Sequence, residues 1–241
     1  MDNKNISLDD KYISGSGTVF VTGIQALVRL PISQSRKDRV IGLNTAGYIS
    51  GYRGSPLGGY DTALWKAEKH LQLNNIKFQP SVNEDLAATA CWGTQQLGFT
   101  ETPKYDGIFS IWYGKGPGVD RSGDPLRHAN LAGSSPNGGV LALAGDDHVA
   151  KSSTTAHQSE QSLIAAMIPI LNPSSVQELF DFGLFGISMS RYAGVWVGLK
   201  CVNEIVESSS TFPIDLEIFL VDRVYKQYTN LDPESYFCEQ H

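Results

Sequence analysis

Two acidic residues stand where an extended segment turns into a helix, a position at which a carboxyl group can do chemistry. Glu84 and Asp85 lie within QPSVNEDLAATACWGTQQLG (79–98), where an Ala-rich, helix-like run follows a short extended segment. In one interpretation Asn83 caps the helix and the two acids complement its dipole, a stabilisation of about 0.3–1 kcal/mol. In the other, a carboxyl group in an enclosed site acts as a tuned acid in catalysis. These residues alone leave both open.

A second segment combines glycine with positive charge. YGKGPGVDRSGD (113–124) contains Lys115 and Arg121 together with two aspartates, and His128 follows one helical turn beyond. Glycine permits backbone turns that other residues resist, and a cationic loop of this kind suits a small carboxylate or phosphate ligand. The same charges could equally form surface salt bridges. The segment is therefore a candidate ligand-binding loop with an ordinary structural alternative.

The segment GDDHVAKS (145–152) differs by one residue from the phosphate-binding pattern GxxxxGK[ST]. Ala150 replaces the second glycine, and two aspartates would repel phosphate from the backbone amides that should hold it. A P-loop-like phosphate-binding protein is therefore a remote alternative. Metal-ligating side chains also gather here: Asp146, Asp147, His148, His157 and Glu160. Adjacent residues on a loop rarely all converge on one ion, so we predict no metal ligands in this chain.

These segments need elements to position them, and the chain alternates between strand-like and helix-like runs. Apolar runs predict strands at 46–52, 76–82, 107–113, 138–145 and 168–173. Helices are expected between them, at 61–73 with Asp61 as the N-cap, and at 84–97, 125–133 and 174–193. This alternation predicts an α/β fold, a mostly parallel sheet with helices on both faces.

Four polar segments follow predicted strands directly: GYRGSP, NED, GKGPGVDRSGD and GDDHVAKSST. Ligands of such sheets bind outside the carboxyl ends of the strands, so we expect all four segments to line one rim. We divide the chain into a flexible lead-in at 1–16, a domain at 17–210, and a tail or the start of a further element at 211–241.

Composition excludes several classes of partner. The formal net charge is −6, and there is no basic run beyond RKDR at 36–39, so nucleic-acid binding is not expected. The apolar runs are too short to span a membrane, and the polar N-terminus is no secretory signal. The cysteines form no CxxC pair, which argues against a zinc site or an iron–sulfur cluster built from this chain. A reduced, cytoplasmic setting is expected.

Four long stretches resemble a known family: RLPISQSRKDRVIGLNTAGYISGYRGSPLGGYD, QPSVNEDLAATACWGTQQ, YDGIFSIWYGKGPGVDRSGDPLRHAN and LALAGDDHVAKSSTTAHQSE. They look like the N-terminal part of the indolepyruvate ferredoxin oxidoreductases in their long fused form. These belong to the 2-oxoacid:ferredoxin oxidoreductases, which use thiamine diphosphate. The resemblance covers about residues 17–210 and implies a thiamine-diphosphate-binding fold, here the domain that binds the cofactor's pyrimidine ring.

The resemblance also implies roles for individual residues. A glutamate at the start of a helix hydrogen-bonds ring nitrogen N1′ in this family, and Glu84 matches it, while Asp85 keeps the capping role. A Ser-Pro or Thr-Pro turn near substrate and cofactor matches the turn in GYRGSP. The implied cofactor-binding residues are Gly54, Ser55, Pro56 and Asn83. Candidates for binding the 2-oxoacid carboxylate are Arg53, Lys115, Arg121 and His128, which the sequence does not rank; Arg53 replaces a proline of shorter relatives.

The family reaction is oxidative decarboxylation of a 2-oxoacid to an acyl-CoA, with electrons passing to ferredoxin. The family pattern for Mg²⁺ and diphosphate, a GDG motif, is missing from this sequence, as are cluster cysteines. Mg²⁺ and [4Fe–4S] are therefore expected only from other domains or a partner subunit, and the chain alone is expected to be inactive. A homodimer is expected by resemblance. The alternative is a non-catalytic oligomerisation or regulatory domain of the same fold.

Overall fold

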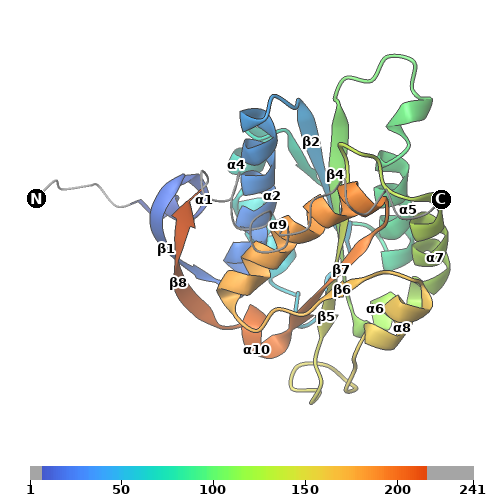
Figure 1. Ribbon diagram of the computed structural model, residues 1–241. Helices are drawn as coiled ribbons and strands as arrows, with labels where there is room; N and C mark the ends of the chain where they lie inside the picture. Colours follow the sequence, from blue (N-terminus) through green and yellow to red (C-terminus); the bar gives the residue numbers. More distant parts are fainter. Residues whose placement is uncertain (1–6, 216–241) are drawn as a thin grey trace, which may run out of the picture.

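A six-stranded parallel sheet forms the centre of the computed structural model, which describes residues 7–215 (Figure 1). Its strand order is β3-β2-β4-β5-β7-β6, and every neighbouring pair is parallel. The strands are β2 (Thr45–Gly51), β3 (Ile76–Phe78), β4 (Gly107–Lys115), β5 (Val140–Asp146), β6 (Ile170–Leu171) and β7 (Val197–Val202). The predicted α/β class and mostly parallel sheet are confirmed.

Helices cover both faces of this sheet, as the alternating pattern predicts (Figure 1). One face carries α2 (Gly23–Val40), α3 (Tyr60–Lys66), α4 (Glu68–Gln72) and α9 (Val176–Ala193). The other carries α5 (Glu84–Thr94), α6 (Gly116–Arg121), α7 (Gly123–Ala132) and α8 (Glu160–Ala165). The remaining helical segments of the described chain are α1 (Asp10–Ile13), η1 (Leu97–Phe99) and α10 (Asn203–Val206).

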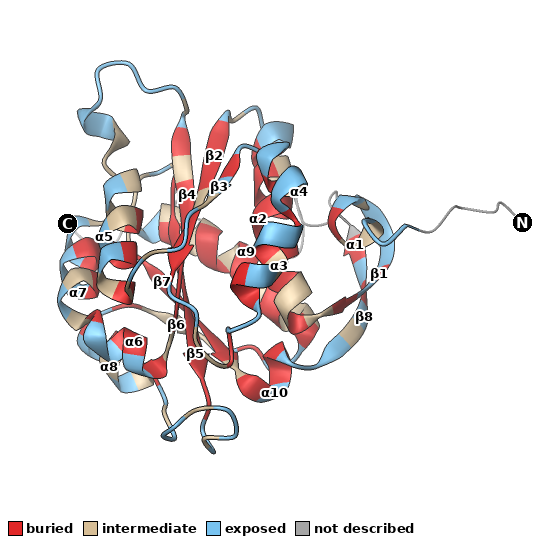
Figure 2. Ribbon diagram, turned by 180° about the vertical axis from the view of Figure 1, so that it is seen from behind, coloured by how far each residue is buried: buried red, intermediate tan, exposed pale blue. Residues whose placement is uncertain are grey.

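The central strands are buried on both sides because helices lie over each face (Figure 2). Along β5, Leu141 and Leu143 enter the core beneath α2 and α9, whereas Ala142 and Ala144 enter the core beneath α5 and α7. The second core is built around Trp112, which is fully buried. This alternation explains why the strands read as continuous apolar runs.

A buried ion pair joins the two long helices on the first face. The two terminal guanidinium nitrogens of Arg191 in α9 contact the carboxylate of Asp38 in α2, at 2.7 and 2.8 Å. Asp38 is fully buried and also accepts hydrogen bonds from Gln34 and Thr45. Each of its oxygens therefore has partners, which is the condition under which a buried charge is tolerated.

A two-stranded antiparallel ribbon lies apart from the main sheet, beside α2 (Figure 1). It pairs β1 (Ser16–Thr22) with β8 (Ser209–Asp215) and follows the short helix α1 (Asp10–Ile13). Helix α1 and the start of β1 lie within residues 1–16, which we expected to be a flexible lead-in, and the expected boundary at 210–211 falls inside β8. The two partners lie at opposite ends of the described chain, so no local pattern announces their pairing. Residues 216–241 of the expected tail lie outside the described residues.

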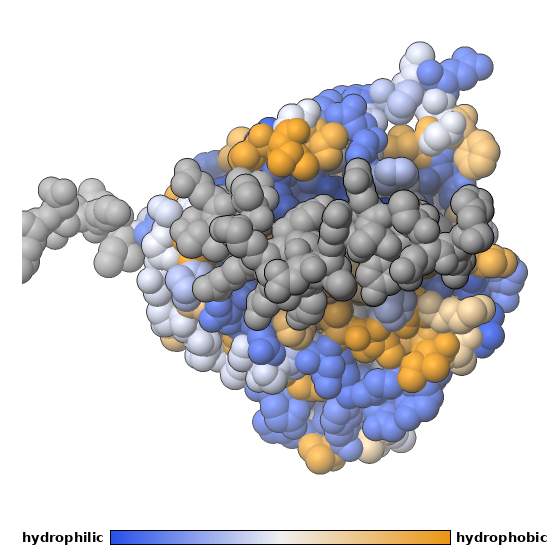
Figure 3. Space-filling model, viewed as in Figure 1, coloured by the Kyte–Doolittle hydropathy of each residue, from blue (hydrophilic) through white to orange (hydrophobic). Residues whose placement is uncertain are grey.

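Hydrophobic residues on the face seen in Figure 1 form separate groups among hydrophilic ones (Figure 3). Within residues 7–215, no helix has the length and apolar character needed to cross a membrane.

Candidate functional site

The four polar segments meet at the carboxyl edge of the sheet, as expected from the parallel strand order. The turn after β2 touches the end of β4, because a Cβ at Gly54 would lie 2.7 Å from Lys115 Cδ. The same turn reaches the loop after β5, where Ser55 Oγ hydrogen-bonds Ser152 Oγ. Glu84, after β3, packs against Gly118 in α6. Contacts therefore run continuously along the rim.

Glu84 is the first residue of α5 and is only 5% exposed. Its side chain fits against two glycines: a Cβ at Gly118 would lie 2.5 Å from Glu84 Oε1, and one at Gly114 would lie 3.2 Å from Glu84 Cγ. Its backbone carbonyl accepts a hydrogen bond of 3.0 Å from the indole of Trp112. The glycines thus make room for the carboxyl group, and the tryptophan fixes the start of the helix.

The neighbours of Glu84 take the structural roles. Asn83 caps α5, since its side-chain oxygen accepts a 2.9 Å hydrogen bond from the Leu86 amide. Asp85 accepts hydrogen bonds from Arg121 Nε at 3.2 Å and from Ser122 Oγ at 3.3 Å. In contrast, no group among residues 7–215 donates a hydrogen bond to the Glu84 carboxylate. Glu84 is buried as a residue, but its carboxyl oxygens still reach solvent, so this group is available for a ligand.

The structure separates the four cationic candidates, which the sequence could not rank. Arg121 is paired with Asp85, and His128 lies 3.4 Å from Asp124 of its own helix. Neither Arg53 nor Lys115 forms an ion pair with any described residue. The Lys115 stem lies over Gly54, so its ammonium group belongs to the same part of the rim as Arg53. The segment 113–124, which we expected to be a cationic loop, is largely helical, since α6 (GPGVDR) begins directly after the end of β4 at Lys115.

Two buried polar groups beneath the turn after β2 were missed by the sequence analysis. Asp61 is not the N-cap of α3, since Gly59 holds that position and Asp61 is buried in the first turn. Burial raises the pKa of Asp61, an effect opposed by Tyr113 and by the charge of Arg53. Burial and then Asp61 raise the pKa of Tyr113. The two groups are near enough to shift each other's pKa, but the geometry gives the Tyr113 hydroxyl no hydrogen bond to Asp61 or to any other described residue, and Asp61 Oδ1 has no partner either. Asp61 is the second residue of α3 and follows a glycine-rich turn. An acid at such a position is usually exposed, so the sequence does not indicate that Asp61 is buried.

The loop after β5 does not bind phosphate as a P-loop would. The Asp147 carboxylate accepts hydrogen bonds from the backbone amides of Lys151 at 2.9 Å and Ser152 at 2.7 Å. The Ser152 amide is the chief reason that the pKa of Asp147 lies below its usual value. A carboxylate of the chain therefore occupies the place of a phosphate. No helix follows the loop directly either, since α8 begins at Glu160. The P-loop-like alternative is wrong.

Two side-chain contacts hold the same loop against its neighbours. Near its centre, Ser153 Oγ lies 3.5 Å from the carbonyl oxygen of Ser55, which precedes the cis peptide bond to Pro56. At its far end, His157 Nε2 lies 2.7 Å from an oxygen of Asp120 in α6. The loop therefore connects the turn after β2 with α6 across the end of β5.

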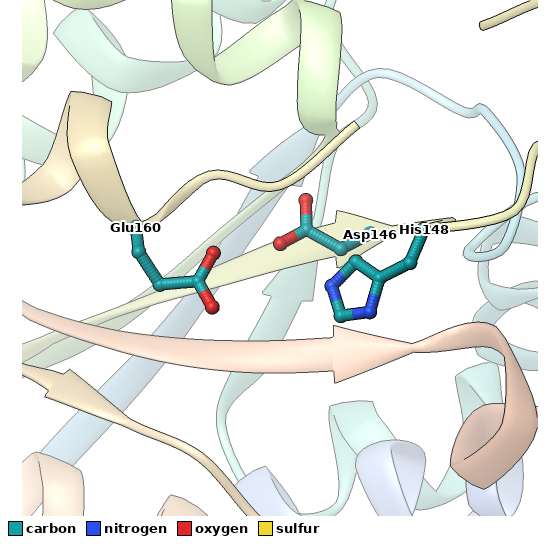
Figure 4. Close-up of side chains that lie close together, drawn as sticks. All are labelled: Asp146, His148 and Glu160. Atoms are coloured by element: carbon teal, nitrogen blue, oxygen red, sulfur yellow. The ribbon is translucent and has the colours of Figure 1, made fainter. Parts of the chain in front are cut away.

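One group of metal-ligating side chains comes from the two ends of this loop and from the loop itself. Ligand atoms of Asp146, His148 and Glu160 all fall within 4.8 Å of one another (Figure 4). Both Asp146 oxygens already accept hydrogen bonds from Ser159, and Glu160 forms an ion pair with the buried Lys200. The Lys200 ammonium group beside Glu160 Oε1 opposes a second cation, whereas Glu160 Oε2 has no hydrogen-bond partner in the described chain. We assign no metal to this group.

Comparisons with known proteins bear on the fold. No family model matches the chain, and no curated protein matches it. Among solved structures, it resembles the 2-oxoglutarate:ferredoxin oxidoreductase from Magnetococcus marinus with 2-oxoglutarate, coenzyme A and succinyl-CoA bound, at a TM-score of 0.54 and 12% identity. The match covers 81% of this chain and 31% of that one. This protein thus shares its α/β fold with part of a 2-oxoacid:ferredoxin oxidoreductase, and it spans less than a third of that chain.

Proposed function

We propose that this chain is the N-terminal cofactor-binding part of a thiamine-diphosphate-dependent 2-oxoacid:ferredoxin oxidoreductase of the indolepyruvate type. The observation that carries the proposal is the carboxyl group of the buried Glu84 at the carboxyl edge of the sheet, to which no residue from 7 to 215 donates a hydrogen bond. The resemblance of four long stretches to that family and the shared fold support it.

The residues fit the pyrimidine half of the cofactor. When bound, thiamine diphosphate supplies a carbanion that adds to the 2-oxo carbon of the substrate. Glu84 would hold a proton against ring nitrogen N1′, which requires a carboxyl oxygen that no protein group already occupies. Gly114 and Gly118 leave space for that oxygen, because a side chain at either position would meet Glu84. Asn83 and Asp85 keep the helix start in place around it.

The turn after β2 would provide the neighbouring part of the site, with Gly54, Ser55 and Pro56 beside the cofactor. For the substrate carboxylate we favour Arg53 and Lys115 over Arg121 and His128. The first two form no ion pair in the described chain, although the charge of Arg53 acts on the nearby Asp61, whereas the others are already paired. A guanidinium or ammonium group free of ion pairs binds a carboxylate without first breaking another contact.

The remaining machinery would come from elsewhere in the enzyme. We propose that Mg²⁺, the diphosphate pocket and the iron–sulfur clusters belong to further domains or a partner subunit, together with sites for coenzyme A and ferredoxin. Cofactor sites formed between two domains are common, so the chain alone would be inactive. We further propose a cytoplasmic homodimer.

A matched pair of variants tests the proposal in the complete enzyme. Glu84→Gln keeps the size of the side chain and removes its acid function, whereas Asp85→Asn changes the neighbouring residue that faces Arg121. We expect Glu84→Gln to lower 2-oxoacid-dependent ferredoxin reduction by about 10²- to 10⁴-fold, the range for a lost acid–base group. Asp85→Asn should retain most activity. Near-normal turnover of Glu84→Gln would overturn the assignment.

A further inference from the structure

A chain of hydroxyl groups connects the turn after β2 to the loop after β5. Ser55 Oγ hydrogen-bonds Ser152 Oγ, which lies 3.1 Å from Asp147 Oδ2 and 3.3 Å from Asn203 Oδ1. The chain starts at the rim and ends at two side chains that are at most 1% exposed. The direction in which its protons point determines what Ser55 can offer to a ligand.

Asp147 fixes that direction. Its carboxylate accepts two backbone N–H groups, which keep it ionised, and an ionised carboxylate only accepts hydrogen bonds. The single proton of Ser152 is therefore used on Asp147 or on the Asn203 oxygen. If the Asn203 amide were turned around, Asp147 would still take this proton. Ser152 can then only accept from Ser55, so the Ser55 proton points away from the rim.

We propose that Ser55 faces the cofactor site as a hydrogen-bond acceptor and binds the amino group of the pyrimidine ring, with Ser152 and Asp147 as its positioning residues. This inference rests on the proposed function. Ser55 keeps only its lone pairs for a ligand, so it favours an N–H donor and disfavours an oxygen acceptor. The substrate carboxylate, which has no donor, is thereby left to Arg53 and Lys115.

Two compounds that differ at one group test whether Ser55 accepts a hydrogen bond from the ligand or donates one to it. Thiamine diphosphate carries an amino group on the pyrimidine ring, and oxythiamine diphosphate carries oxygen at the same carbon. Their dissociation constants are measured by calorimetry on the full protein, with any subunits that co-purify. The test variant is Ser152→Ala, which frees the Ser55 proton. The controls are Ser152→Thr, which keeps a hydroxyl, and Ser153→Ala, which removes only the neighbouring contact to the Ser55 carbonyl.

We expect wild type to prefer thiamine diphosphate, and Ser152→Ala to reduce this preference by about fivefold, the value of one neutral hydrogen bond. Ser152→Thr and Ser153→Ala should keep the wild-type ratio. Ser152 is exposed and Asp147 retains its backbone donors, so melting temperatures should stay equal. An unchanged ratio in Ser152→Ala, with both compounds bound, would overturn the inference and leave the proposed function standing. Failure of wild type to bind either compound would overturn both.

Discussion

Gly118 leaves the space that the Glu84 carboxyl group occupies, and replacing it with alanine tests whether that position matters. The added Cβ would lie 2.5 Å from Glu84 Oε1, 2.7 Å from its Cγ and 2.8 Å from its Cδ. Ordinary van der Waals contact begins at 3.4 Å, so the carboxyl group must move by 3.4 − 2.5 = 0.9 Å or more. A displacement of about 1 Å can cost on the order of 10²-fold in rate when it misplaces a catalytic group.

The stability of this variant should change much less than its activity. Overpacking costs about 1–3 kcal/mol, but alanine is favoured over glycine within a helix by about 1 kcal/mol, and the glutamate can rotate away. We therefore expect a loss of about 2 kcal/mol at most in the free energy of unfolding, measured by urea denaturation. Ferredoxin reduction by the complete enzyme and its affinity for thiamine diphosphate should both fall.

Gly123→Ala is the matched control, because a Cβ there meets nothing within 4 Å. It lies in the next helix and should keep activity with equal or slightly higher stability. If Gly118→Ala retained full cofactor affinity and turnover, the buried position of Glu84 would have no functional meaning, and the reasoning from its missing donor would fail.

Three further predictions follow from other contacts. Asp38→Ala leaves Arg191 without its partner and should lower the free energy of unfolding in urea by about 3–5 kcal/mol; a loss below 1 kcal/mol would contradict the buried ion pair. Burial would raise the pKa of Asp120, but hydrogen bonds from the His157 and Ser162 side chains outweigh it and lower the pKa. The ionised Asp120 carboxylate therefore stabilises the fold fully above about pH 4, which is its pKa in the unfolded chain, and this stabilisation is lost as pH falls through its lower pKa in the folded chain. Asp120→Asn should therefore make the free energy of unfolding in urea depend less on pH below about pH 4. Lys115→Met should raise KM for the 2-oxoacid about tenfold with kcat nearly kept, whereas Arg121→Met should change neither; equal effects would refute the ranking of the cations.

The sequence predicted the main sheet because its signals are local. Each buried strand is a short apolar run, and each helix between strands has its own pattern, as in α9 with its Ser175 cap. The rim followed from this, since parallel strands place their carboxyl ends on one edge. The β1–β8 ribbon was missed, because Phe20 and Thr211 become neighbours only when the chain has folded around the whole sheet.

The site was only partly accessible from sequence for a similar reason. The sequence identifies Asn83 as the N-cap, but Glu84 and Asp85 are both acids in the first turn, and only their surroundings distinguish them. Asp85 meets Arg121 from another helix, and Glu84 meets a glycine. The near match to a phosphate-binding loop was resolved in the same way, by Asp147 folding back onto the amides of its own loop. Such distinctions depend on contacts between segments, which no single segment reveals.

The β1–β8 ribbon brings the first and last strands of the described chain together. Ser16 lies opposite Asp215, so the polypeptide enters and leaves at the same place, outside the sheet and beside α2 (Figure 1). A domain built in this way can be spliced into a longer polypeptide, or its two ends joined and new ends opened elsewhere, without re-routing any strand of the sheet. A circularly permuted protein should therefore keep the architecture around Glu84, provided that it retains α1, whose Lys11 carbonyl accepts a hydrogen bond from the fully buried Arg29, and that a linker joins the start of α1 to the end of β8.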